Sequence, residues 1–225
     1  MSTRAFGLGN NQLYTGDAST VAPGRTQLQI YTDTSRAAET RLGGLALRRG
    51  LTSNTEMKVA YSYIWNFAGP DVQIGPNAGL KWRFAGDGRR KPSLAVSGLY
   101  IVNHSVGGRS RKNDAAFTLL GSYTTPYAEL LANYGRVWVG DDRSSDLRYL
   151  SLAAVRPVAK TLIAALEYSE IKRIHTGGPR PLGRQWAAGV VYLGGSGWSY
   201  GVQIGYLLDN PNANWHTTVG AATYF

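Results

Sequence analysis

The sequence lacks cysteine, holds only two methionines, and contains no run of about 18 apolar residues. The lack of cysteine excludes a disulfide scaffold and any metal site with thiolate ligands. The lack of a long apolar run argues against a membrane-spanning helix. No segment keeps a helical period of hydrophobicity, and no linker is large enough to divide domains. For 225 residues, these absences leave one large all-β domain as the expected fold class.

The residues that are abundant suit strands and tight turns, since the chain has 28 glycines and 14 tyrosines. Alternation of apolar and polar residues recurs along the chain, with turn residues between the segments. The predicted strands are residues 25–32, 41–49, 55–65, 77–85, 93–103, 115–123, 127–138, 147–155, 160–170, 185–193, 198–208 and 215–225. Residues 1–23 are polar, and we expect a lumenal or disordered N-terminal tail there, followed by a barrel over 24–225.

The predicted connections alternate in length. Long ones fall at 33–40, 66–76, 104–114, 139–146, 171–184 and 209–214, and the connections between them are short. This alternation is typical of up-and-down barrels of the bacterial outer membrane, whose periplasmic turns are short. An even number of strands would place both termini on the periplasmic side. No apolar segment follows Met1-Ser2-Thr3-Arg4, so we expect the export signal to be absent from this chain.

The aromatic residues separate into two groups along the predicted strands. Counting back by twos from Phe225 gives an uncharged face that ends at Trp215. On the same face of the other strands, tryptophans lie near the long connections or near the short ones, with aliphatic residues between. The predicted girdle residues are Trp65, Trp82, Trp138, Trp186, Trp198, Trp215 and Phe225. Two girdles around an aliphatic band predict a closed antiparallel transmembrane β-barrel of about 12 strands. A soluble sandwich or lipocalin-like barrel would show no such separation.

The opposite face is polar and would line the lumen. Its candidate pore-lining residues are Arg48, Glu56, Lys58, Lys81, Arg83, Glu129, Asn133, Glu167, Gln185 and Gln203. The cations at 58, 81 and 83 fall on neighbouring predicted strands, and Glu56 shares the face of Lys58. Opposite charges at this spacing can pair. The cluster is therefore either a charged constriction that selects permeants or an ion-pair network that braces the wall.

Several short phrases resemble the outer-membrane proteins of the MetA-pathway-of-phenol-degradation family. They are the opening strand at 23–30, the turn RGLTSNTE at 49–56, the strand IGPNAGLKWRF at 74–84, and shorter matches at 91–96, 133–135 and 209–211. The resemblance covers most of residues 20–225. It implies an outer-membrane channel or transporter for small solutes, with hydrophobic or aromatic compounds as permeants. A closed barrel that only anchors something in the membrane is the alternative.

An enzyme is not expected. Outer-membrane lipid esterases use a Ser–His pair, and His104-Ser105 lies at the end of a predicted strand. Adjacent strand residues point to opposite faces, whereas a catalytic pair needs hydrogen-bond reach. We therefore expect no catalytic residues. His175 and His216 lack metal-ligand spacing, so we expect no metal and no cofactor.

The net charge of +10 raises the question of an anionic partner. The basic clusters lie in predicted loops and no RNA-binding signature is present, so nucleic acid is not expected. Cations of the predicted outer loops either bind lipopolysaccharide phosphates or serve solubility and orientation: Arg109, Arg111, Lys112, Lys172, Arg173, Arg180 and Arg184. The expected partners are thus outer-membrane lipid and lipopolysaccharide, a small permeant and the barrel-insertion machinery.

Overall fold

A computed structural model of the chain describes residues 16–35, 40–66, 72–87, 91–105, 112–140, 145–175, 178–195, 197–209 and 215–225. Among these residues, no helix is long and apolar enough to cross a membrane. The strands are β1 Thr26–Ser35, β2 Thr40–Gly50, β3 Thr55–Asn66, β4 Val72–Ala85, β5 Ser93–Ile101, β6 Asn103–Ser105, β7 Asp114–Thr124, β8 Glu129–Trp138, β9 Leu147–Ala159, β10 Leu162–His175, β11 Gly178–Leu193, β12 Trp198–Leu207 and β13 Trp215–Tyr224.

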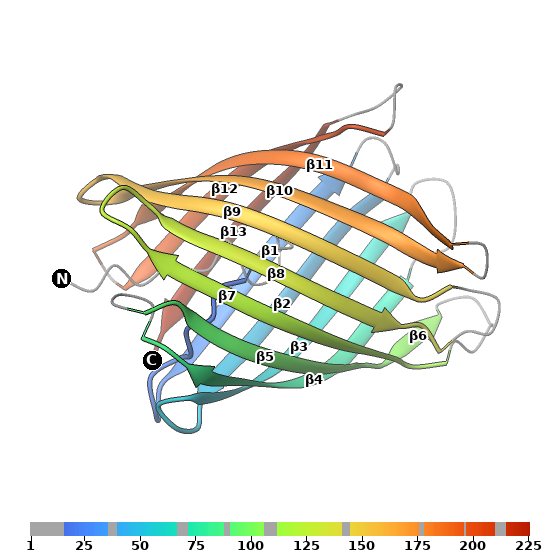
Figure 1. Cartoon of the computed structure of the whole chain (residues 1–225), viewed down its shortest axis with the longest axis horizontal. Coiled ribbons are helices and arrows are strands. Elements are labelled where there is room, and N and C mark those ends of the chain that lie inside the picture. The colour runs from blue at the N-terminus through green and yellow to red at the C-terminus, as the bar shows by residue number, and fades with distance from the viewer. Residues whose placement is uncertain are drawn as a thin grey trace.

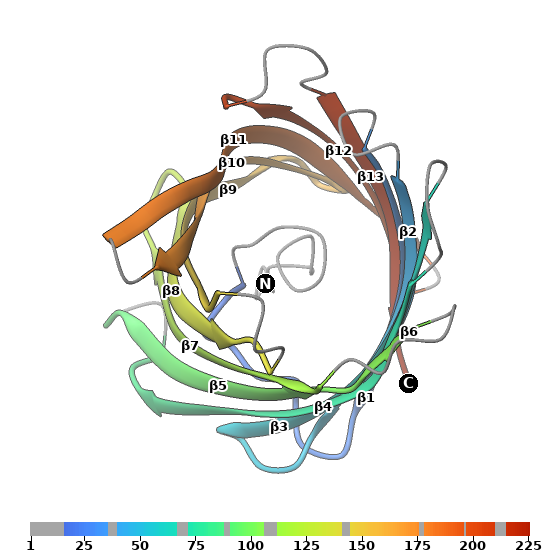
Figure 2. The same ribbon diagram turned by 90° about the vertical axis from the view of Figure 1, so that its right-hand side faces the viewer.

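The strands close into one barrel. Sequential strands pair antiparallel, β3 pairs with β4, and β1 pairs with both β2 and β13, so the ring has no free edge. The short β6 continues β5, since both pair with β4. These two segments form one stave of the wall, which gives twelve staves. The predicted closed antiparallel barrel of about 12 strands is therefore confirmed. Figure 2 shows the ring, and Figure 1 shows its tilted strands.

The short turns, the start of β1 and the end of β13 lie at one end of the barrel. The amide of Thr26 donates to the carbonyl of Phe225 and the amide of Phe225 donates to that of Thr26, at 2.8 and 2.9 Å. At the same end, Leu51 and Thr125 begin tight turns closed by backbone hydrogen bonds. The predicted long connections join strands at the other end, called the long-loop end below.

The two faces of the wall differ in the way that the alternation predicts. Outward positions are exposed and apolar or aromatic, as along β8, where Leu130, Tyr134 and Trp138 alternate with buried Leu131 and Asn133. Inward positions are mostly small or polar, and many of them are buried. An apolar exterior around a polar interior suits a barrel with lipid outside and water or polar groups inside.

Several strand boundaries differ from the sequence-based prediction, and those of β4, β10 and β11 differ most. β10 and β11 run to His175 and from Gly178, although residues 171–184 were predicted as a connection. The regular alternation of apolar and polar residues is lost in this part of the sequence, but the backbone ladder continues through it. β4 begins at Val72 because a bulge lets the chain pass Gly75-Pro76. Gly75 has φ of +120°, and a Cβ there would lie 2.9 Å from the carbonyl oxygen of Ala60.

Candidate functional site: the inner face of the barrel

The candidate pore-lining residues all occupy inward positions. Arg48, Glu56, Lys81, Asn133, Glu167, Gln185 and Gln203 are buried, and Lys58, Arg83 and Glu129 are half-buried. They come from β2, β3, β4, β8, β10, β11 and β12. The structure divides them into two groups, since the cations lie on β2–β4 and the carboxylates Glu129 and Glu167 lie on β8 and β10. In a ring of twelve staves, β10 is opposite β3. A wall with an excess of cations, of which Glu56 offsets a part, therefore faces Glu167 across the lumen.

A buried ion-pair cluster forms the basic side. The Nε of Arg48 donates to Oε1 of Glu56 at 2.9 Å, and Nζ of Lys81 lies 3.2 Å from the same oxygen. The side-chain amide of Gln27 on β1 also belongs to the cluster, since Nη1 of Arg48 donates to Oε1 of Gln27 at 3.0 Å. The register of the strands brings these charged side chains together. Glu56 is directly opposite Lys81, and it lies two residues from Lys58, which is directly opposite Arg48. Arg48, Glu56 and Lys81 thereby each have a partner of opposite charge inside the wall.

Residues 16–22, which precede β1, lie inside the barrel against this cluster. The amide of Val21 donates to Oε2 of Glu56 at 2.7 Å. Nζ of Lys81 lies 3.3 Å from the carbonyl oxygen and 3.5 Å from Oδ1 of Asp17. The fully buried Ala18 packs against Ala95 of β5 and Leu120 of β7. We call residues 16–22 the lumenal segment. It crosses from the β3–β4 wall toward β7 near the short-turn end.

The opposite wall carries amides, hydroxyls and an apolar patch. Glu167 of β10 accepts from Nε2 of Gln203 on β12 at 3.3 Å. Nearer the short turns, Ile163 and Val191 form a buried inward cluster with partly buried Val155 around it. The lumen is therefore polar in its middle and partly apolar near the short-turn end.

Two inward tyrosines lie over glycines of the neighbouring strand. Tyr31 of β1 covers Gly44 of β2, and its hydroxyl is 2.8 Å from Oγ of Ser62 on β3. Tyr149 of β9 covers Gly135 of β8 in the same way and is hydrogen-bonded to Thr118 of β7. Each ring thus ties three strands together while it rests on the wall, because a glycine lets it approach.

Other predicted residues have a different setting. Arg83 holds a short turn, since its Nη2 donates to the carbonyl oxygen of Ser53 at 2.9 Å and to Oδ1 of Asn54 at 3.0 Å. His104 and Ser105 occupy consecutive positions of β6, the spacing that does not favour a catalytic pair. Among the described residues, no group of three or more His, Asp or Glu could hold a metal ion.

The predicted girdle residues lie on the outer face. Trp65, Trp82, Trp138, Trp186, Trp215 and Phe225 are exposed, and Trp198 is partly exposed. At the long-loop end, Tyr168, Trp186, Tyr206 and Trp215 follow one another across β10–β13, with ring centroids 5.2 Å apart for the first pair and 4.9 Å for the last. Phe225 and Trp198 lie at the opposite end, near the end of β13.

The sequence predicts a lumenal or disordered tail at 1–23, but it marks neither the wall contacts of that tail nor the packing of Tyr31 and Tyr149 on glycines and the hydrogen bond to Ser62. Asp17 is a single carboxylate in a polar tail, so no local pattern marks it as a partner of Lys81. The packing of the two tyrosines on glycine could have been predicted, since each lies in register with a glycine on the neighbouring strand once the strands are aligned. A scan for inward aromatics opposite glycine would have found them.

The fold is shared with outer-membrane channels. An outer membrane channel from Pseudomonas putida F1 superposes with a TM-score of 0.69 at 11% identity, covering 93% of this chain and 98% of that chain. The NanC porin gives 0.67 at 9% identity with 87% and 98% covered, and the KdgM porin gives 0.65 at 10% with 88% and 99% covered. No protein-family model and no curated protein matches the sequence. At these identities the similarity concerns the fold.

Proposed function

We propose that this protein is an outer-membrane channel for small solutes, with both termini on the periplasmic side. The proposal rests on the difference between the outer and inner faces of the closed barrel wall. The outside is an apolar band with aromatics at both borders, and the inside holds charges of both signs on opposite walls. A wall of this kind separates lipid from a polar path. The shared fold with porins supports it, and one of them, KdgM, was solved in complex with disordered oligogalacturonate.

The permeant that we propose is a small hydrophobic or aromatic compound. The phrases that resemble the MetA-pathway-of-phenol-degradation family suggest this class, and membership of that family is part of the proposal. The inward apolar cluster at Ile163, Val191 and Val155 supports it, because it offers an apolar ring a surface inside the barrel. The pore-lining role of Arg48, Lys58 and the other candidates is proposed on their inward placement.

A closed barrel is the second candidate function, and the lumenal segment favours it. Asp17 and Val21 are held on the Glu56–Lys81 pair, so the segment occupies part of the lumen near the short-turn end. In this case the barrel only anchors something in the membrane, and the lumenal segment is a stopper, meaning that it blocks the lumen. The two candidates predict different currents.

Single-channel recording in planar bilayers tests both. For a channel, we expect the full chain to give a small conductance with weak ion selectivity, because the two walls carry opposite charges. Replacing Lys58 and Lys81 by Glu should shift the reversal potential toward cations, and replacing Glu129 and Glu167 by Lys should shift it toward anions. Both shifts should shrink as salt rises. If the full chain carries no current and a variant without residues 1–23 does, the segment is a stopper. If neither conducts, the channel proposal is wrong.

The permeant requires a separate measurement. Vesicles that contain the barrel should take up a small aromatic solute faster than vesicles without it. Substituting Ile163 and Val191 by Asn should reduce that uptake while leaving ion conductance nearly unchanged. Equal uptake with and without the barrel would overturn the aromatic permeant.

A further inference from the structure

A row of cations lies on the outer face at the long-loop end. Arg136 of β8 is directly opposite Arg148 of β9, which is directly opposite Lys172 of β10. All three share the outward face with the exposed Leu150 and Leu152 of β9. Like charges directly opposite one another destabilise a sheet. Three in succession therefore favour the approach of anionic groups.

The carboxylates nearby offset part of this charge. Arg136 pairs with Asp146 at 2.7 Å, Lys172 with Glu170 at 2.9 Å, and Arg184 of β11 with Asp209 at 2.6 Å. The hydrogen bond from Arg184 holds the pKa of Asp209 below its usual value, so that partner stays ionised. Arg148, at the centre of the row, makes no ion pair with the residues that the structure describes. Among the described residues at this place, four cations thus stand against three carboxylates, and the surplus lies in the middle.

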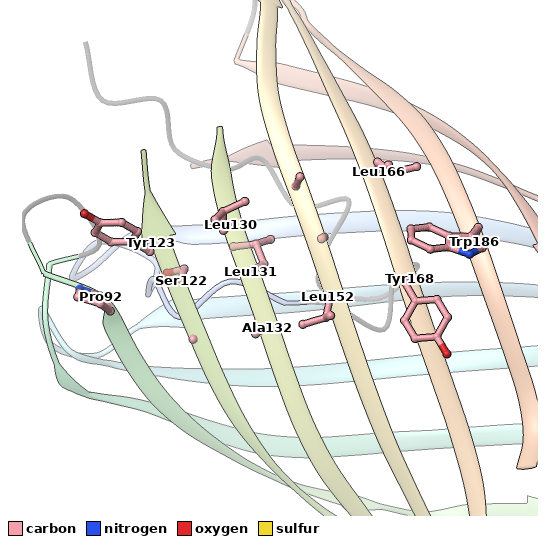
Figure 3. A pocket seen from close by; sticks show the side chains of 13 residues that line it. Pro92, Ser122, Tyr123, Leu130, Leu131, Ala132, Leu152, Leu166, Tyr168 and Trp186 are labelled. Carbon is pink, nitrogen blue, oxygen red and sulfur yellow. The ribbon is translucent and has the colours of Figure 1, made fainter. Parts of the chain in front are cut away.

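An apolar hollow lies on the same strands beside the row. Its volume is about 740 Å³, and its lining comes from β7–β11 with Pro92 at one side. Most of the lining residues face outward. Figure 3 shows Leu130, Leu152, Leu166 and Trp186 on neighbouring strands around it. Ala132 and Ala154 are small, which leaves the wall hollowed between larger neighbours. A hollow on this face opens to lipid chains.

The row and the hollow are close enough for one lipid. Leu152 lines the hollow and Arg148 lies four residues along β9, which is about 13 Å for extended backbone. Because the strands are tilted, the difference in depth is smaller, comparable to the step from the upper acyl chain to the headgroup. Arg136 also lies over the ring of exposed Trp138, with 5.3 Å from its Cζ to the ring centroid. Tryptophan rings of this kind mark the headgroup level.

We propose that Arg136, Arg148 and Lys172, with the hollow below them, form a binding site for a phosphorylated lipid of the outer leaflet, namely the lipid A part of lipopolysaccharide. The cations contact a phosphate through charge-assisted hydrogen bonds, and an acyl chain fills the hollow. A free phosphate would use the cations alone. The site rests on the outer-membrane location proposed above but is independent of conduction, so a barrel that carries no current can still bind the lipid.

Native mass spectrometry and titration of the full chain in detergent test the site. The probes are bisphosphorylated lipid A, lipid A with its phosphates removed, and inorganic phosphate, all with EDTA to remove bridging divalent cations. The variant is Arg148→Gln with Lys172→Gln. The matched control is Arg156→Gln, which changes an exposed outward arginine of the same strand β9 at the short-turn end. Heat-modifiable gel migration verifies that each variant is folded.

The wild type should bind bisphosphorylated lipid A, and the double variant should bind it at least about tenfold more weakly, as expected for losing charge-assisted hydrogen bonds. The control should bind as the wild type does. Ala132→Phe, which fills the hollow, should weaken lipid A binding without altering any weak binding of inorganic phosphate. Equal affinity of wild type and double variant overturns the proposal. So does an equal loss in Arg156→Gln, which indicates non-specific attraction. Equally tight binding of inorganic phosphate would make this a simple anion site and would also overturn it.

Discussion

Replacing Glu56 by Gln should destabilise the barrel more than any other single loss of charge in the ion-pair cluster. Oε1 of Glu56 accepts from Arg48 at 2.9 Å and lies 3.2 Å from Nζ of Lys81, while Oε2 accepts from the amide of Val21 at 2.7 Å. Glutamine keeps the shape but loses the charge. Its amide NH₂ would also face a donor, whichever way it is turned. Arg48 and Lys81 would remain buried with Lys58 nearby.

The expected magnitude follows from burial. Both side chains of the Arg48–Glu56 pair are at most 6% exposed. Removing one partner of a buried pair typically costs about 3–5 kcal/mol, because the other charge is left uncompensated. Part of that cost should disappear when the excess cation is also removed. The double variant Glu56→Gln with Lys81→Met should therefore be more stable than the sum of the two single effects predicts.

The assay is equilibrium unfolding in guanidinium chloride of the barrel in lipid vesicles, followed by tryptophan fluorescence. The matched control is Glu170→Gln, which removes a carboxylate at 2.9 Å from Lys172 in a pair that is 18% and 30% exposed. That pair should contribute only about 0–1 kcal/mol. A loss for Glu56→Gln no larger than that of Glu170→Gln would mean that water solvates the cluster fully, and the reasoning would fail.

Two further predictions concern the wall. Leu119→Arg places a charge on the outer face and should lower the free energy of unfolding in vesicles by about 2–4 kcal/mol, whereas Ser97→Arg, inward on the neighbouring strand, should cost much less; equal costs would mean that the faces are assigned wrongly. Gly135→Ala places a Cβ 2.2 Å from Cζ of Tyr149, so the ring should swing into the lumen and reduce single-channel conductance. Gly121→Ala, with no atom closer than 3.7 Å, should leave conductance unchanged, and an unaltered current in both variants would show that the ring does not limit the path.

The sequence predicted the wall better than what the wall encloses. Alternation and the position of aromatics such as Trp186 and Phe225 depend on the surroundings of each strand, so they are visible in a single chain. The strand extension through Lys172 was missed because a backbone ladder needs no apolar side chains. The bulge at Gly75-Pro76 was read as part of a connection for a similar reason, since it breaks the alternation but not the pairing.

The contacts inside the lumen were less predictable because they join residues that are distant in sequence. The neighbourhood of Lys81 and Glu56 was foreseen from strand alignment. The contact of Lys81 with Asp17 spans 64 positions and involves a tail with no pattern of its own. The surplus charge at Arg148 also escaped detection, because its neighbours are set by register across three strands and not by spacing along one.

The position of the lumenal segment has a consequence for the order of assembly. Its contacts with the wall close loops of 35 and 64 positions, from Val21 to Glu56 and from Asp17 to Lys81. The seam that completes the ring brings Gln27 and Tyr224 together over 197 positions. Short loops close at lower entropic cost than long ones, so we expect the N-terminal hairpins and the segment resting on them to form before β13 reaches β1. In that order of events, the wall closes around a segment that is already in place, and the segment does not have to be threaded through a finished barrel.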